Sequence, residues 1–293
     1  MMRILGTIFA VLLGLAFGSF LNLCLTRWPE EESVVKPRSH CRHCSHTLTW
    51  WENVPLISWL LLHGRCRNCH NWIGWRYPLV ELAVAVLWAS SAWQALTAMM
   101  GPDASASFVY IGLPNAIGMM VFYWLLVALA VLDFENLWLP DWITWPGIVL
   151  GFLFTVASAI FATASPLNDG FAIVKAAVYS LAGTVLAAGL VLFIRWIYLL
   201  FRHREGIGFG DAKLLALLAA WLGLPQALLS FAVGVVLGAM VAVALLAFPS
   251  TRAKSESWAL NKMPLGTFLC IGGVVSSLWG GRILTAYLGW AGF

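Results

Sequence analysis

The chain alternates between long apolar runs and short polar connections, and this pattern predicts its architecture. Seven runs have few charges and approach the roughly 20 residues that cross a bilayer as a helix. They cover residues 4–26, 78–100, 115–132, 143–163, 172–200, 226–248 and 264–290. A shorter run, 212–224, brings the count to eight. The pattern therefore predicts an all-α polytopic membrane protein with about eight transmembrane helices.

The composition excludes a soluble protein. Of the 293 residues, 61% are hydrophobic and 10% are charged, and the mean hydropathy is +0.85. Soluble domains carry about 25% charged residues, and their cores cannot absorb this much apolar surface. Arg3 precedes the first run as in a signal peptide, but the run is too long and no A-x-A site ends it. We therefore expect a retained helix.

The basic residues predict the orientation, because cytoplasmic loops carry the excess of Lys and Arg. They concentrate in three connections, at 27–76, 195–213 and 252–262, which we place in the cytoplasm. The connections at 101–114 and 163–171 contain none and are placed outside, together with both termini. This asymmetry accounts for the net charge of +4, so we expect membrane lipid around the protein and no nucleic-acid partner.

One long segment, 27–77, is clearly not membrane-spanning. It holds five of the six histidines and four of the six cysteines. We therefore predict three parts: a first transmembrane helix (1–26), a small cytoplasmic domain inserted after it (27–77), and the remaining transmembrane domain (78–293).

The cysteines of this segment form two C-x-x-C pairs separated by about twenty residues. They are Cys41, Cys44, Cys66 and Cys69. Each pair offers two thiolates from one turn, which predicts a tetrahedral zinc site. The alternative is a pair of disulfides, which are rare in the reducing cytoplasm. Four cysteine ligands leave no open position for a catalytic water, so the zinc would be structural.

Aspartate is scarce, which allows candidates to be found by elimination. The chain contains Asp103, Asp133, Asp141, Asp169 and Asp211. Asp103 and Asp169 lie in the predicted outer connections and suit solvated turns. Asp133 directly follows an apolar run and Asp211 precedes one, at the predicted cytoplasmic margin. Ionisable groups there are functional candidates, but a helix N-cap for Asp211 and a solvated helix end for Asp133 are alternatives.

Two carboxylates that share one proton can hydrolyse a peptide bond. One acts as general base on water, while the other, still protonated, binds the scissile carbonyl. Asp141 follows Pro140 and suits a turn or helix start. Two other classes of function stay open: a transporter that carries protons or cations on Asp133 and Asp211, and a non-enzymatic adaptor that docks through its zinc domain.

Four short motifs stand out along the chain: Gly18-Ser-Phe-Leu-Asn22, Arg76-Tyr-Pro-Leu-Val-Glu81, Asp133-Phe-Glu-Asn-Leu-Trp-Leu-Pro-Asp141 and Gly208-Phe-Gly-Asp211. They resemble the motifs of type IV prepilin peptidases, bacterial inner-membrane aspartyl proteases of the GxGD type. The resemblance implies that Asp133 and Asp211 are catalytic, that 78–293 is the protease domain, and that the active site faces the cytoplasm. The chain departs from the family's common pattern at Glu135, at Asn136 and at Met263–Phe268.

The resemblance also implies the substrate and a second activity. The substrate would be a prepilin or pseudopilin of a type IV pilus or type II secretion system, cut after its short basic leader. Many members with the cysteine segment also N-methylate the new terminus with S-adenosyl-L-methionine. No Gly-rich nucleotide motif supports a soluble-type methyltransferase fold. Asn22, Arg76 and Glu81 are candidates for the donor site, but helix packing and a helix-entry ion pair explain their motifs equally well.

Overall fold

In the computed structural model, the regular secondary structure of the described residues is helical, apart from two isolated β-bridges. These are residues 1–100, 106–162, 170–203, 208–247 and 263–292. In this part of the chain seven helices are long and apolar enough to cross a membrane. They are α1 (Met2–Arg27), α3 (Arg76–Met99), α4 (Ala106–Asn136), α5 (Asp141–Ala162), α6 (Gly170–Arg202), α8 (Leu224–Ala247) and α10 (Leu265–Ala291). The predicted fold class is confirmed.

The short run at 212–224 forms helix α7 (Phe209–Leu222). Its 14 residues extend about 21 Å at 1.5 Å per residue, which is less than the roughly 30 Å of a bilayer's hydrocarbon core. Most of its side chains are buried, because α5, α6, α8 and α10 all pack against it. The eighth predicted helix is therefore an interior one.

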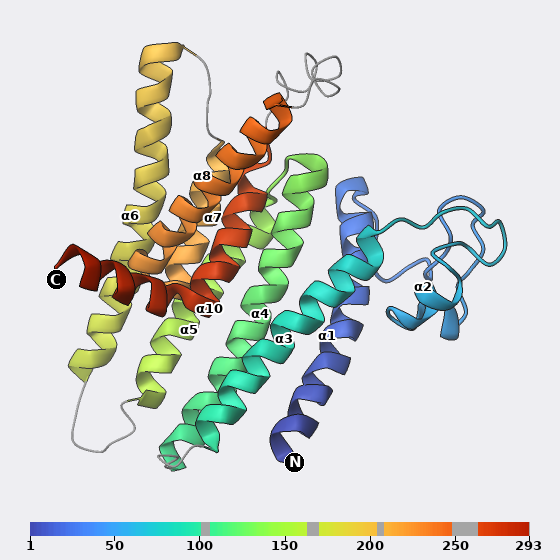
Figure 1. Ribbon diagram of the computed structural model, residues 1–293, viewed down its shortest axis with the longest axis horizontal. Coiled ribbons are helices and arrows are strands. Elements are labelled where there is room, and N and C mark those ends of the chain that lie inside the picture. The colour runs from blue at the N-terminus through green and yellow to red at the C-terminus, as the bar shows by residue number, and fades with distance from the viewer. Residues whose placement is uncertain (101–105, 163–169, 204–207, 248–262, 293) are drawn as a thin grey trace. The chain divides into compact units, whose positions relative to one another are not determined.

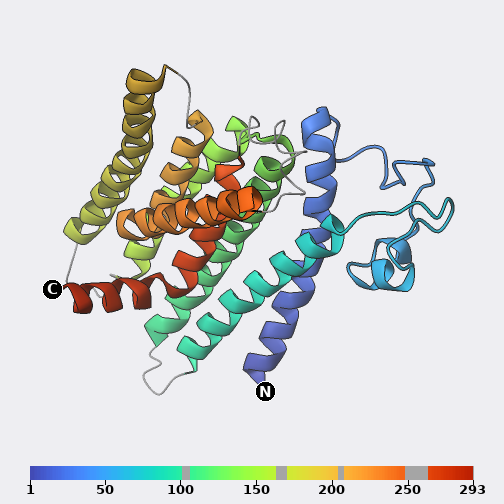
Figure 2. The same cartoon turned by 45° about the horizontal axis from the view of Figure 1, so that its top comes forward.

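The chain divides into two compact units, and the first is Met1–Ala128. Its main contact joins α1 to α3, which run side by side in both views (Figures 1 and 2). Gly18 of α1 makes this possible, because a Cβ there would lie only 2.7 Å from the Cα of Glu81. A glycine at this contact lets the two helix backbones approach closely.

The segment between α1 and α3 contains three short helices, η1 (Trp28–Glu30), η2 (Trp51–Asn53) and α2 (Ile57–Leu61). Its cysteines lie in two turns with the same hydrogen bonds. The backbone N–H of Cys41 donates to His46 and that of Cys66 donates to Asn71, both at 2.9 Å. The two turns therefore present their thiols in the same way.

The second unit, Leu129–Phe293, is built around α7 (Figure 1). Trp221 of α7 donates its indole N–H to the carbonyl of Gly147 in α5 at 2.9 Å. Thr155 of α5 donates its hydroxyl to Ala220 of α7, also at 2.9 Å. These bonds fix α7 against α5 and thereby position the start of α7, where Asp211 lies.

Several sequence predictions lie outside the described residues. They include the turn roles of Asp103 and Asp169 and several basic residues of the connections at 195–213 and 252–262, namely Arg204, Arg252, Lys254 and Lys262. The orientation in the membrane and the division at 26 and 77 stay predictions.

Candidate active site

Asp211 lies in the first turn of α7 and is 9% exposed. Gly208 is the N-cap residue, and its backbone N–H donates to Oδ2 of Asp211 at 3.1 Å. Asp211 does cap the helix, although from the third position rather than as the N-cap residue. The first amides of a helix lack intrahelical acceptors and favour a negative group.

Asp133 lies in the last turn of α4 and is only 6% exposed, so it is not a solvated helix end. Its Oδ2 accepts the backbone N–H of Thr267 at 2.7 Å. The hydroxyl of Thr267 lies 3.2 Å from the same oxygen and 2.9 Å from the carbonyl of Ala130. Thr267 is in the first turn of α10, so this carboxylate too is held by the start of a helix.

Asp211 and Asp133 lie in the same part of the second unit, because Gly210 beside Asp211 and Gly266 beside the carboxyl group of Asp133 both face Cδ1 of Leu139. Two glycines leave room for this arrangement. A Cβ on Gly266 would lie 2.9 Å from Cγ of Asp133, and Cβ atoms on Gly266 and Gly210 would lie 3.1 and 3.0 Å from Cδ1 of Leu139. The site therefore consists of two buried acids, each fixed by a backbone amide, with glycines at the contacts. Such a pair can share a proton and activate water.

Asp141 has a different environment. It is the first residue of α5, its side chain is 68% exposed, and it forms an ion pair with Lys213. An exposed, paired carboxylate at a helix start has a structural explanation. The prediction of a helix-start position for Asp141 agrees with this placement.

The four cysteines of the two turns lie together, as their spacing predicts, with all sulfur atoms within 4.8 Å of one another. The Sγ atoms of Cys41 and Cys69 are 3.8 Å apart, and those of Cys44 and Cys66 are 3.9 Å apart. Sulfurs at a disulfide would be about 2.05 Å apart, whereas Zn–S bonds of about 2.3 Å in a tetrahedron place them about 3.8 Å apart. The cluster can hold a metal ion.

The pKa values of the clustered cysteine thiols also favour binding of a cation. Hydrogen bonds from the backbone of His46 and the side chain of Asn68 lower the pKa of Cys44 to about 6. The backbone N–H of Asn71 lowers the pKa of Cys69, but burial and the neighbouring cysteines outweigh it and raise that pKa to about 12. Four adjacent thiols do not all ionise at neutral pH without a cation, and a bound metal removes this barrier.

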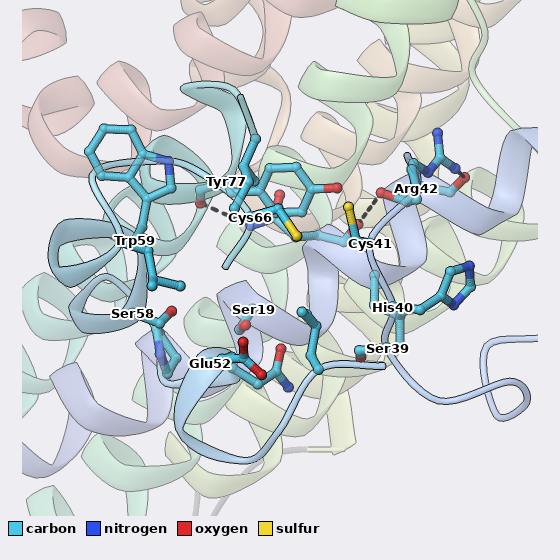
Figure 3. A pocket seen from close by; sticks show the side chains of 18 of the residues that line it. Ser19, Ser39, His40, Cys41, Arg42, Glu52, Ser58, Trp59, Cys66 and Tyr77 are labelled. Atoms are coloured by element: carbon cyan, nitrogen blue, oxygen red, sulfur yellow. Dashed lines mark hydrogen bonds between the residues drawn. The ribbon is translucent and has the colours of Figure 1, made fainter. Parts of the chain in front are cut away.

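The three candidates for the methyl-donor site meet where α1 and α3 pack. Asn22 donates its amide to the carbonyl of Tyr77 at 2.9 Å, and Arg76 donates to the hydroxyl of Thr26 at 2.6 Å. Oε2 of Glu81 accepts the backbone N–H of Leu56 at 2.8 Å. Asn22 and Glu81 line a cavity of about 920 Å³, whereas Arg76 does not. Figure 3 shows Ser19 and Tyr77, which line the same cavity.

Sequence reasoning missed Thr267 and Gly266 as neighbours of Asp133. They lie in Met263–Phe268, which the sequence marked only as a departure from the common motif. The contact joins residues that are 134 positions apart, and no local pattern encodes such a contact. The only signal in the sequence was that Met263–Phe268 occupies the position of a motif of the resembled family.

Two family descriptions match the chain. The bacterial peptidase A24 N-terminal domain matches residues 12–95, and the type IV leader peptidase family matches residues 120–243. The first match contains the cysteine turns and the second contains Asp133 and Asp211. No solved structure matches the chain.

Similar proteins are named prepilin leader peptidase/N-methyltransferase. The one from Pseudomonas putida is 32% identical, over 97% of this chain and 94% of the relative. That from Burkholderia pseudomallei (strain 1026b) is 35% identical over 93% and 85%, and that from Aeromonas hydrophila is 33% identical over 94% and 92%. This chain, a multi-pass membrane protein, therefore belongs to the type IV leader peptidase family, as its motifs predicted.

Proposed function

We propose that this protein hydrolyses the peptide bond between the short basic leader and the body of a type IV prepilin or pseudopilin. Asp133 and Asp211 are the catalytic pair. The observation that carries this proposal is their geometry: two buried carboxylates, each fixed by a backbone N–H at the start of a helix, beside two glycines that face the same Leu139 side chain. The names of the relatives support the same reaction.

The reaction needs one proton on the pair. One carboxylate removes a proton from water, and the water oxygen bonds to the scissile carbonyl carbon. The protonated partner donates its proton to the carbonyl oxygen and stabilises the tetrahedral intermediate. The C–N bond then breaks, its electron pair stays on nitrogen, and a proton passes from the pair to the leaving amine. The amides of Gly208 and Thr267 keep the carboxylates oriented throughout.

The leader would be cut on the cytoplasmic side of the bacterial inner membrane, with the cysteine segment on the same side. The basic residues of the described connection at 27–76 support this orientation. Membrane lipid covers the apolar side chains that the helices expose. We propose no nucleic-acid partner.

We propose that Cys41, Cys44, Cys66 and Cys69 bind one structural zinc ion. Four soft thiolates at tetrahedral spacing suit zinc, and they leave no open position for a substrate. A segment this short and irregular would derive much of its folding free energy from the metal.

We further propose N-methylation of the new terminus, with S-adenosyl-L-methionine as the donor. The lone pair of the unprotonated amine forms the N–C bond, the C–S electron pair stays on sulfur, and the product loses one proton from nitrogen. The relatives' names include this activity. Asn22 and Glu81 are the residues we assign to donor binding, whereas Arg76 supports the helix entry through Thr26.

A transporter is the weaker explanation. Transporter sites usually lie near the membrane midplane on broken helices, whereas Asp133 lies in the final turn of α4 and Asp211 in the first turn of α7. Membership of a peptidase family favours hydrolysis over a transporter or a docking adaptor.

The test is cleavage of a prepilin by the purified full-length protein and three variants. Asp133→Asn and Asp211→Asn should each lose about 10²–10⁴-fold in rate, which is the usual contribution of general acid–base catalysis. Asp141→Asn is the matched control and should keep most of the activity. Cleavage at the wild-type rate by Asp133→Asn would refute the assignment.

A further inference from the structure

The short helix α2, in the cysteine segment, exposes an apolar face. Ile57, Leu60 and Leu61 occupy positions i, i+3 and i+4 of this helix, which lie on one face. Their exposed fractions are 57%, 64% and 66%. Several large apolar side chains exposed together indicate a surface that contacts a protein partner or a membrane. The structure therefore leaves this face open to an apolar neighbour.

Two tryptophans extend this apolar surface. The ring of Trp59 in α2 lies 5.6 Å from that of Trp72 and 4.6 Å from that of Trp75, between centroids. A Cβ on Gly64 would lie 2.5 Å from Trp72 and 2.9 Å from Trp59, so the chain that leaves α2 lies directly against both rings. Trp72 and Trp75 are nevertheless exposed. We define the apolar patch as the five exposed side chains Ile57, Leu60, Leu61, Trp72 and Trp75.

Helix α3 continues the patch along a membrane-spanning face. Trp75 directly precedes α3, and its carbonyl accepts the backbone N–H of Leu79 at 3.2 Å, so the two side chains lie on one helical face. Leu82 and Val86 follow on that face, seven and eleven positions after Trp75. All three α3 side chains are exposed, in a helix long and apolar enough to cross a membrane. The patch is therefore continuous with a stripe that suits contact with lipid.

The chain enters α2 beside this span. Leu56 has a φ of 57° and a ψ of −48°, and Ile57 donates its N–H to the carbonyl of Pro55 at 2.6 Å, which is a γ-turn of the rare, strained kind. The N–H of Leu56 donates to Oε2 of Glu81 at 2.8 Å. Glu81 lies about 7.5 Å along α3 from its first residue, at 1.5 Å per residue. Interfacial helices bury their apolar face about 5–10 Å into the boundary between headgroups and acyl chains. Glu81 therefore holds the start of α2 at a depth that suits such a helix.

The charge of this stretch favours an anionic bilayer surface over a second copy of the chain. Residues 55–76 contain Arg65, Arg67 and Arg76 and no Asp or Glu. In a symmetric dimer the same surface meets itself, so these arginines would meet like charges. Anionic headgroups instead attract each nearby Lys or Arg by about 1 kcal/mol, and Trp is enriched where headgroups meet acyl chains. The composition around the patch therefore matches a lipid interface.

We propose that the apolar patch docks the cysteine segment onto the membrane surface, with anionic phospholipid as its partner. The exposed side chains of α2 insert among the outer parts of the acyl chains, and Trp72 and Trp75 lie at headgroup level. The segment thereby has a third attachment to the membrane, in addition to α1 and α3 at its two ends. This docking concerns lipid alone and does not rest on either proposed reaction.

The test is the depth of a nitroxide spin label on the full-length protein in vesicles of phosphatidylethanolamine and phosphatidylglycerol. Ile57→Cys and Leu61→Cys carry the label in the patch, and Glu31→Cys carries it at an exposed position of the same segment outside the patch. The native cysteines are buried or belong to the cluster, so wild type treated with the label gives the background. Electron paramagnetic resonance then compares collisions with oxygen, which dissolves in lipid, and with a water-soluble nickel chelate.

Labels at positions 57 and 61 should collide more with oxygen than with the chelate, at a depth of about 5–10 Å in the headgroup and acyl boundary. The label at position 31 should show the reverse. Frequent collisions with the chelate at the patch positions would mean that the patch faces water, and rare collisions with both reagents would mean that protein covers it. Either result overturns the proposal. The thermal unfolding midpoint identifies the variants that keep their fold, and one folded patch variant suffices for the decision.

Discussion

The two units use a glycine beside a buried acid in different ways. In the first unit Gly18 faces the Cα of Glu81, so the glycine brings two helix backbones together. In the second unit Gly266 faces the carboxyl group of Asp133, so the glycine leaves room for the side chain itself. The first contact therefore sets helix packing, whereas the second sets the position of a reacting group.

The acids of the two units also face different surroundings. Glu52 and Glu81 line a cavity with aromatic walls, where Glu52 lies 3.6 Å from the ring nitrogen of His46 and Glu81 accepts the N–H of Leu56. Asp133 and Asp211 are held by backbone amides at helix starts, which suits acid–base catalysis. Placement rather than residue type therefore separates the proposed roles.

Among substitutions outside the two catalytic aspartates, the largest effect is expected for Gly266→Ala. A Cβ would lie 2.9 Å from Cγ of Asp133, so the carboxylate must move. A displacement of about 1 Å in a catalytic group costs about 10²-fold, so cleavage should fall by about that factor. Gly281→Ala on the same helix is the control, because nothing lies within 4 Å of its added Cβ. Equal rates in the two variants would show that Gly266 does not position Asp133.

A double variant, Cys41→Ser with Cys44→Ser, tests whether the catalytic aspartates work independently of the metal cluster. It should contain no stoichiometric zinc by elemental analysis, because two thiolates do not complete the tetrahedral site. The thermal unfolding midpoint should fall, while prepilin cleavage should stay within about tenfold of wild type, since the aspartates lie in the other unit. Zinc at one per chain in this variant would contradict the assigned ligands.

Gly18→Ala should affect stability instead of chemistry. Its Cβ would lie 2.7 Å from the backbone of Glu81, so α1 and α3 must separate. Overpacking of this kind costs about 1–3 kcal/mol. Unfolding in detergent would measure the loss, with Gly6→Ala as the comparison, because there the nearest atom is the flexible end of Leu96. A Gly18→Ala protein as stable as wild type would remove the packing role.

The smallest effect is expected for Thr267→Val. The hydroxyl has one proton, and its bond to the Ala130 carbonyl, at 2.9 Å, is shorter than its 3.2 Å contact with Asp133. The backbone N–H remains in the variant, so the cleavage rate should stay within about threefold of wild type. A loss beyond about thirtyfold would mean that the hydroxyl, rather than the amide, holds Asp133.

Most of the fold could be predicted from the sequence, because the length of an apolar run is a local property that indicates a membrane-spanning helix. All seven long helices were expected at their observed positions, and the C-x-x-C spacing predicted that the four sulfurs would meet. The interior position of α7 could not be predicted, because it depends on four helices that pack around it.

Contacts between distant segments explain what was missed at the sites. Thr267 reaches Asp133 from α10, and the cavity combines Asn22 of α1 with Glu52 and with Glu81 of α3. Composition around Asp133 suggested a helix end exposed to water as readily as a buried acid. Tertiary packing, which one sequence does not display, decides between these alternatives.

The central claim is that leader cleavage and N-methylation use separate sites. Its most direct test is the intact mass of pilin products made with S-adenosyl-L-methionine present. Wild type should release a cleaved pilin with one added methyl group. Glu81→Gln should cleave the leader but leave the terminus unmethylated, and Asp211→Asn should methylate a supplied pilin that is already cleaved. The account is contradicted if every variant that loses methylation loses cleavage to the same degree, or if Asp211→Asn cleaves as the wild type does.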